Sequence, residues 1–557
     1  MTNKTIVIIF LLIILLLPFI SPLIDNHYYV SADFRIQIVR LWTMITNIAA
    51  GNPLAHWSDL IYNGYGSPMF LFYPPFYYYL LTILYKTGID FFVCFQIINI
   101  AGFILSALAM FIFARNFFNL RTAFLISFLY ATSSYHLYDI YRSGQFVEAF
   151  IWFYLPLLLH CIYKYFTTGN HKYYIYNSIV FFVFLITHHS SFVIIIIPSL
   201  IYILLLALYT KKKNILALVL LSLFTGICLS VYFTIPCFFE KESVLFGVKP
   251  DNDFHNNFIP LQKIFLFFLN SDNSNPLRMP QSLNLAAVIL SCFSLLMISK
   301  KEKNRYIFLS FFIFFIFGLF FNLKLSTRVW ESVKIIEYLE TPGRFIFVMS
   351  FSTSILSGIV INRISNTIKA YLLIFMVIVL TFYQTKDHIK VYTIKDKPFI
   401  YLQQYFKNFD IENFNPKTIK QFKYYTSEDF LLLPVTFNAV KYNRPFSNRI
   451  ESNGGIITNF IEKPFELFFY LKMKDTENIL AHIPYFNGWS VYINNIKQDI
   501  IITGDGLISF RVTHGFHKIQ IKFELTLLRK ISIIISILSF IVLSIFTFII
   551  LQQNKKT

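Results

Sequence analysis

The 557-residue sequence has few charged side chains, since Asp, Glu, Lys and Arg together make up 14% of it. Soluble domains carry about 25% charged residues. The shortage argues against a soluble fold, and hydrophobic residues account for 56% of the chain. Apolar runs of roughly 17 residues or more recur along it, and a helix of that length crosses the hydrocarbon core of a membrane. We therefore expect a polytopic α-helical membrane protein.

Acidic residues are scarce: 29 Asp and Glu stand against 48 Lys and Arg, which gives a formal net charge of +19. Such an excess can indicate nucleic-acid binding, but no nucleic-acid-binding motif accompanies it. Much of the excess lies in short loops between apolar runs, where the positive-inside rule predicts it. We expect no nucleic-acid partner.

Cysteine is also rare, and its placement excludes a disulfide framework. The five cysteines lie within or beside apolar runs, and none falls in the polar C-terminal region. No small-x-small cleavage site follows the first apolar run, which we therefore interpret as a membrane anchor and not as a cleaved signal peptide. The heavy use of Phe, Ile, Asn and Lys suggests an AT-rich, bacterial genome.

About twelve membrane spans are predicted, with one short exception. They lie near 5–23, 92–114, 121–137, 148–166, 174–190, 191–209, 214–234, 283–299, 306–322, 342–361, 370–384 and 528–551. If these spans alternate, the basic loops share one face with both termini, and the positive-inside rule makes that face cytoplasmic. Segment 74–86 is short and rich in Tyr, so we interpret it as an interfacial or re-entrant helix.

The polar region 385–527 has no spanning run, and its second half alternates apolar and polar residues as β-strands do. Turns are predicted at Asn487-Gly488, Asn494-Asn495, Gly504-Asp505-Gly506 and His514-Gly515. We expect a small extracytoplasmic β-sandwich here. The predicted organisation is a membrane domain over 1–384 with a first outer loop at 24–91, the mainly β domain over 385–527, and a final span with a cytoplasmic tail over 528–557.

Asp33 lies in the first outer loop, directly before apolar residues at helical spacing. A carboxylate at the membrane surface can act as a metal ligand or as a general base that takes a proton from an acceptor hydroxyl. The alternative is a solvated loop carboxylate, or an N-cap of the following helix, for which Ser31 also qualifies. The sequence leaves these interpretations open.

Aromatic residues are frequent in the same loop: Trp57, Tyr73, which precedes Pro74-Pro75, and Tyr77 to Tyr79. Their rings could grip a sugar or a prenyl tail, although an ordinary aromatic belt at the membrane interface explains them equally well. Farther on, Arg142 and Glu148 flank a glycine in an outer loop. An ion pair at such a site is either functional or a structural pair that closes the bundle.

Two further cationic sites lie on the same face. His188-His189 falls at an outer turn between two spans, and adjacent histidines favour a phosphate contact over a metal site. Arg344 follows Glu340-Thr341-Pro342-Gly343 and opens a span. A guanidinium there can hold a lipid phosphate with two hydrogen bonds, or it can simply snorkel to the interface.

Several segments in this order resemble a known family: Asp33, Gly51 to Pro53, Trp57, GYGSPMFLFYPPFYYYL, Arg142 to Glu148, His188-His189, ETPGRF, and the tail FNGWSVYINNIKQ with GDGLISFRVTHGFHKIQIKF. Together they look like the bacterial YfhO-like membrane proteins, which include the pyruvoyl-tetrahydropterin-synthase-related membrane domain. These are similar to the GT-C glycosyltransferases, among them protein mannosyltransferases and aminoarabinose transferases.

The resemblance implies a GT-C-like transmembrane domain in a bacterial plasma membrane, with a polyprenyl-phosphate-linked sugar as donor and an envelope glycan or lipid as acceptor. It implies Asp33 as the catalytic residue. Arg142, Arg344, His188 and His189 would hold the donor phosphate, while Trp57, Tyr73, Pro74 and Glu148 would shape the substrate site.

The chain departs from the family pattern near Asp33. Arg35 and Gln37 stand where many relatives are expected to have a histidine, and no second acid adjoins Asp33. No three-histidine zinc site of the soluble pterin synthase is present. The missing histidine and the missing second acid near Asp33 leave open whether a divalent metal ion is needed. Two other classes remain as alternatives: a transporter or flippase for lipid or polysaccharide, for which no inverted repeat is found, and a non-catalytic envelope scaffold.

Overall fold

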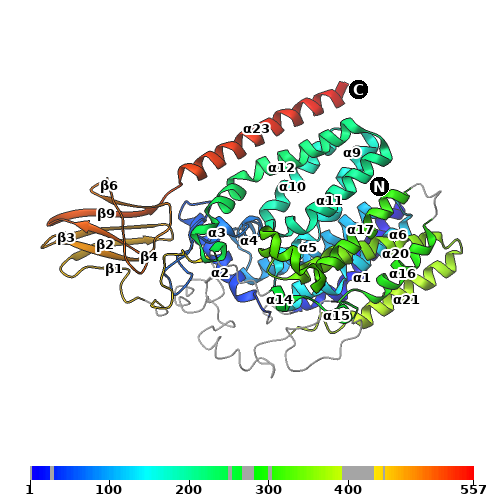
Figure 1. The fold of residues 1–557 in the computed structure, drawn as a ribbon, viewed down its shortest axis with the longest axis horizontal. Coiled ribbons are helices and arrows are strands. Elements are labelled where there is room, and N and C mark those ends of the chain that lie inside the picture. Colours follow the sequence, from blue (N-terminus) through cyan, green and yellow to red (C-terminus); the bar gives the residue numbers. More distant parts are fainter. Residues whose placement is uncertain are drawn as a thin grey trace.

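The computed structural model describes residues 3–25, 31–248, 254–265, 282–298, 304–391, 432–442 and 446–556. A bundle of helices forms most of the molecule, and a β-domain projects from one end of it (Figure 1). The first half of the predicted polar region, up to residue 431, lies largely outside the described residues.

Nine helical stretches of the described chain are long and apolar enough to cross a membrane. They contain α1 (Asn3–Asp25), α5 (Phe91–Ala114), α8 (Phe146–Ile151) with α9 (Tyr154–Thr168), α11 (His189–Thr210), α12 (Lys213–Glu240), α17 (Arg305–Asn322), α20 (Ile346–Arg363), α21 (Thr367–Thr385) and α23 (Leu527–Lys556). Two more apolar helices, α10 (Lys172–Thr187) and α16 (Leu285–Met297), are shorter. A polytopic helical membrane protein is thus confirmed.

The predicted span 121–137 is wrong as a continuous helix. Helix α6 (Leu120–Ala131) ends early, and α7 (Ser134–Tyr138) and a π-helical turn (Asp139–Ser143) follow it. The break falls at Ser133, whose φ of −56° and ψ of 136° are not helical. Its hydroxyl lies 2.9 Å from that of Ser350 on α20, so a polar contact inside the bundle accompanies the turn.

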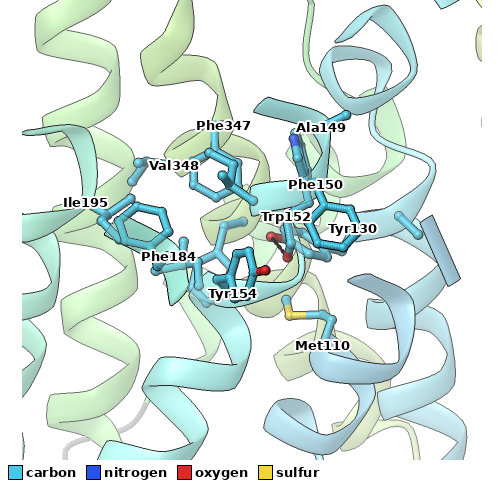
Figure 2. Packing of buried hydrophobic residues seen from close by; sticks show 14 of the residues in the cluster. Met110, Tyr130, Ala149, Phe150, Trp152, Tyr154, Phe184, Ile195, Phe347 and Val348 are labelled. Carbon is cyan, nitrogen blue, oxygen red and sulfur yellow. Dashed lines mark hydrogen bonds between the residues drawn. The ribbon is translucent and has the colours of Figure 1, made fainter. Parts of the chain in front are cut away.

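Helix α20 is the centre of the bundle, since every residue from Ile346 to Ile361 is buried. Beside it the Trp152 ring lies 4.9 Å from that of Tyr130 and 5.0 Å from that of Phe347 (Figure 2). The Tyr130 hydroxyl donates to the Trp152 carbonyl at 2.8 Å. Aromatic contacts of this kind add about 0.5–1.5 kcal/mol each beyond simple burial. This packing fixes α8, which carries Glu148.

The outer helices present apolar side chains away from the protein. Phe10 of α1, Phe375 of α21 and Phe540 of α23 each expose more than 60% of their surface. In water such faces would be costly, whereas hydrocarbon solvates them. Their exposure therefore fits helices that contact lipid.

The described part of the predicted first outer loop folds into α2 (Phe34–Ala49), α3 (Met69–Phe72) and α4 (Phe76–Lys86). The predicted helix after Asp33 is confirmed as α2. Segment 74–86 forms only the 11 residues of α4, too short to span a membrane, as predicted. Inside the loop, Asn47 donates to the Trp57 carbonyl at 3.1 Å. Gly66 takes a φ of +101°, and a Cβ there would clash with the Trp57 ring.

The C-terminal strands form two antiparallel sheets, of orders β1-β4-β8-β7 and β2-β3-β9-β5-β6. They are β1 (Ile450–Glu451), β2 (Ile456–Lys463), β3 (Glu466–Met473), β4 (Glu477–Pro484), β5 (Trp489–Ile493), β6 (Ile496–Gln498), β7 (Ile501–Ile502), β8 (Leu507–Val512) and β9 (Gly515–Phe523). Buried residues of both sheets, such as Phe469 and Phe510, share one hydrophobic cluster. The β region is confirmed, although β1, β2 and β3 were not recognised in the sequence.

The β-domain, defined here as β1 to β9, is attached to the membrane domain by aromatic contacts and by polar contacts at the base of α23. The Trp57 ring lies 5.1 Å from that of Trp489 and 5.3 Å from that of Phe523. At the base of α23, Arg529 donates to Glu240 of α12 at 2.9 and 3.1 Å, and to the carbonyl of Asn487, between β4 and β5, at 2.7 Å. The side chains of this ion pair are 1% and 9% exposed.

Candidate functional site

A cavity of about 510 Å³ lies at the end of the bundle that carries the β-domain. Its walls come from the start of α2, from α8, from the α10–α11 turn, from the end of α12 and from the 3-10 turn Pro342–Phe345. All but two of the predicted site residues line it: Asp33, Tyr73, Pro74, Glu148, His188, His189 and Arg344. Segments that are distant in the sequence thus converge on one space.

Asp33 precedes α2 in the N-cap position, but its side chain makes no capping hydrogen bond. Its backbone is held by the neighbouring loop, because its N–H donates to the Ser143 carbonyl at 2.8 Å. Gly144 allows this close approach with a φ of +71°, and a Cβ there would lie 2.3 Å from the Ser31 hydroxyl. The side-chain cap that the sequence left open is therefore not formed, and the carboxylate lines the cavity.

Arg344 carries a buried positive charge in the cavity wall, with only 7% of the residue exposed. Its Nη2 lies 3.0 Å from Glu340 Oε2, and its Nε lies 3.4 Å from Glu148 Oε2. The Tyr135 hydroxyl donates to the other Glu148 oxygen at 2.9 Å. Buried charges need such compensation. The two carboxylates fix the guanidinium at the cavity wall.

The predicted pair of Arg142 with Glu148 is wrong, because Glu148 pairs with Arg344 instead. Arg142 is fully buried, donates to the Asp387 carbonyl and does not line the cavity. The chain reverses at left-handed Gly144, between the π-helical turn that carries Arg142 and the helix that carries Glu148. Sequence proximity therefore did not bring the two side chains together.

A second buried acid, Asp139, lies behind Glu148. Burial, followed by repulsion from Glu148, raises the pKa of Asp139 well above its usual value. Of these two acids, Glu148 is the one that contacts Arg344. No sequence pattern marked Asp139, since only the tertiary fold places it beside another acid.

Trp57 also lies away from the cavity. It is completely buried between the first outer loop and the β-domain, against Trp489 and Phe523. The structure thus places it where it fastens the two domains together.

The histidine pair lines the cavity at the turn between α10 and α11. His188 Nδ1 lies 2.6 Å from the Ser191 hydroxyl. The His189 ring packs 5.6 Å from Phe233, and its Nε2 lies 3.9 Å from the Cys237 sulfur. Both imidazoles can donate a hydrogen bond to an anion in the cavity.

Two cations of the cavity were missed in the sequence, Arg40 and Lys241. The Arg40 guanidinium carbon lies 3.6 Å above the centre of the Tyr73 ring, and the ammonium of half-buried Lys241 lies 4.7 Å from that of Tyr338. Arg40 follows Asp33 by seven residues, which is two helical turns and therefore one face of α2. That spacing was the signal available for Arg40.

The remaining wall is apolar and comes from α10, α11 and α12. It includes Leu185, Phe192, Val193, Ile227, Phe233 and Phe238. Phe238 exposes 55% of its surface, and Ile227 exposes 37%. The wall therefore continues from the charged part of the cavity to the surface that faces lipid.

Metal-ion binding was left open by the sequence. Among the described residues, no three His, Cys, Asp or Glu side chains come together as a metal site would require. The cationic side chains are the groups of this cavity that suit an anionic ligand.

No protein-family model and no curated protein matches the chain. Among solved structures it is similar to the oligosaccharyltransferase of Archaeoglobus fulgidus. The apo form gives a TM-score of 0.48 at 13% identity, over 81% of this chain and 62% of that one. The form with a tethered acceptor peptide gives 0.47 at 14%, over 81% and 61%. The complex with an inhibitory peptide and a dolichol-phosphate gives 0.45 at 14%, over 81% and 62%. This chain thus spans about three fifths of their length, and similarity at this level supports no statement about activity.

Proposed function

We propose that this protein is a GT-C-type membrane glycosyltransferase of a bacterial plasma membrane. It moves a sugar from a polyprenyl-phosphate donor to an envelope glycan or lipid acceptor on the extracytoplasmic side. One observation carries the proposal: a single cavity combines a carboxylate without a capping role, Asp33, with the buried cation Arg344 and an apolar wall that reaches the lipid-facing surface.

In the proposed reaction, Asp33 accepts the proton of the acceptor hydroxyl. The hydroxyl oxygen forms a bond to the anomeric carbon of the donor sugar, and the bond from that carbon to the phosphate oxygen breaks. The electron pair leaves with the lipid phosphate, and inversion at the anomeric carbon is expected. A positioned general base contributes typically 10²–10⁴-fold to such a step.

The departing phosphate gains negative charge, so fixed cations near it stabilise the transition state most. Arg344 is the best placed, because Glu148 orients its Nε. The side chain of Glu340 is 44% exposed, and a phosphate oxygen can replace it on Nη2. His188 and His189 add neutral hydrogen-bond donors from the neighbouring turn.

The lipid chain of the donor fits the apolar wall formed by α10, α11 and α12. Ile227, Phe233 and Phe238 lie in this order along α12, and Ile227 and Phe238 expose 37% and 55% of their surface. A polyprenyl tail there keeps its contact with hydrocarbon while its phosphate enters the charged part of the cavity. Tyr73, which stacks on Arg40, and its neighbour Pro74 would then shape the space for the sugar.

The test is transfer by the purified full chain in liposomes, with radiolabelled polyprenyl-phosphate sugars and an envelope extract as acceptor. Label that moves from the lipid to the extract supports the proposal. Label that crosses the bilayer while still attached to its lipid would instead indicate a flippase. Absence of both would leave the scaffold alternative.

A further inference from the structure

The five-stranded sheet of the β-domain has an outer face that differs from ordinary solvated surface. Along β3 and β9, alternate residues are buried: Leu467, Phe469 and Leu471 face inward, as do Ile519 and Ile521. The residues between them therefore point outward. They are Glu466, Phe468, Tyr470 and Lys472 on β3, and Phe516, Lys518, Gln520 and Lys522 on β9.

Three aromatic rings meet on this face. The rings of Tyr470 and Phe516 are stacked, with centres 5.4 Å apart and planes within 13° of parallel, and the Phe468 ring lies 5.5 Å from that of Tyr470. Phe516 keeps 63% of its surface exposed. Cross-strand packing stabilises a sheet, but it does not require aromatic surface to stay in contact with solvent, and grouped exposed rings mark binding surfaces.

Positive charge surrounds the rings. Lys518 lies opposite Tyr470, and Lys472 lies opposite Phe516 in the strand register. Lys472 is exposed and forms no ion pair within the described chain. Among the described residues, the Lys518 ammonium contacts two neutral groups, Asn495 Oδ1 at 3.2 Å and the Phe468 ring at 5.5 Å.

The carboxylates of this face are already occupied. Glu466 is bound by Gln520 and by Lys463 at 3.3 Å. Glu524, which follows β9, is bound by Lys522 at 3.2 Å and by the Tyr492 hydroxyl at 2.9 Å. The charge left without a partner is therefore positive and lies beside the stacked rings.

We propose that this outer face binds an acidic polysaccharide, one whose sugar rings carry carboxylate or phosphate groups. A sugar ring presents C–H groups on its flat side, which pack on an aromatic ring, and hydroxyls on its edge, which bond to polar side chains such as Gln520. Lys472 and Lys518 supply the counter-charge. The proposal does not depend on the transfer reaction, and the face lies on the β-domain and not in the cavity.

Two other partners fit the face less well. A peptide that adds to a sheet uses the free backbone of an edge strand, whereas the rings lie on β3 and β9 inside the sheet. A lipid surface would have to reach a domain that projects beyond the ends of α12 and α23 (Figure 1).

The test uses the full chain in nanodiscs of neutral lipid, with a short oligogalacturonate as the probe. We expect saturable binding that weakens as salt rises. The double variant Tyr470→Ala/Phe516→Ala should bind about tenfold more weakly or worse. Lys472→Gln/Lys518→Gln should weaken binding and flatten its salt dependence. Ile502→Ala, which removes a 45% exposed apolar side chain from β7 of the other sheet, should bind as the wild type does.

Two further probes make the result decisive. Polyglutamate has the charge without sugar rings, and the proposal requires that it bind weakly and show no effect of the aromatic variant. Failure of oligogalacturonate to bind, equal binding of polyglutamate, or attachment to phosphatidylglycerol vesicles through the same residues would each overturn the proposal. Because the lysine variant leaves the aromatic packing intact, a folding defect of the aromatic variant cannot decide the outcome alone.

Discussion

Arg344 and Glu148 form a buried ion pair in the cavity wall. Arg344 Nε lies 3.4 Å from Glu148 Oε2, and the side chains are only 9% and 2% exposed. Arg344 lies in the turn before α20, and Glu148 lies on α8 beside the aromatic core of the bundle. Glu340 gives the same guanidinium a second, more exposed partner. The arginine is thus anchored on one side and exchangeable on the other, which suits a group that receives an anionic ligand.

Arg344→Ala should weaken donor binding and also destabilise the protein. Loss of one partner of a buried pair costs about 3–5 kcal/mol, because the other charge is left uncompensated. Adding Glu148→Gln removes that charge and should restore most of the stability but none of the donor affinity. Thermal unfolding in detergent and binding of a labelled polyprenyl-phosphate sugar measure the two effects separately. Recovery of both together would mean that Arg344 is only structural.

Asp33→Asn should lower transfer roughly 100-fold or more, because the amide cannot accept the proton of the acceptor. Donor binding and protein yield should hold, since the cations of the cavity are unchanged. Asp90→Asn is the matched control: Asp90 is also an N-cap carboxylate, but its side chain accepts from the N–H groups of Phe92 and Val93. Full transfer by Asp33→Asn at equal yield would remove Asp33 from the mechanism.

Trp57→Ala should destabilise the attachment of the β-domain by about 3–5 kcal/mol, the usual range for a buried Trp. Donor binding should change little, because Trp57 does not line the cavity. Trp57→Phe keeps part of the contact with Trp489 and Phe523 and should be milder. Limited proteolysis of the β-domain reports the attachment. A selective loss of donor affinity, with normal resistance to protease, would return Trp57 to the substrate site.

Topology can be tested on intact spheroplasts. Protease added outside should cleave the β-domain and spare the Lys211-Lys212-Lys213 loop, because that loop lies at the opposite ends of α11 and α12 from the cavity. The positive-inside rule places its three lysines in the cytoplasm. Cleavage at this loop in sealed cells would contradict the predicted orientation.

Local pattern was enough for much of the fold. The apolar runs predicted all nine helices of the described chain that are long enough to cross a membrane, because a membrane helix must be apolar over most of its length. The Asn494-Asn495 turn was also predicted, because two-residue hairpin turns need positive φ and favour asparagine there. In the structure the two residues take φ values of 50° and 67°. The break in the predicted span 121–137 was not, because Ser133 turns there toward a hydroxyl on α20 that only the packed bundle supplies.

The sequence by itself determined the class of the protein, the helix after Asp33 and most of the predicted site residues that line the cavity. Only the tertiary structure decided their partners. In it, Glu148 pairs with Arg344 and not with Arg142, and Arg40 lies over Tyr73. Trp57 packs against the β-domain and does not line the cavity. The physical reason is that apolar periodicity is a local property of the chain, whereas the pairing of buried charges depends on which helices meet.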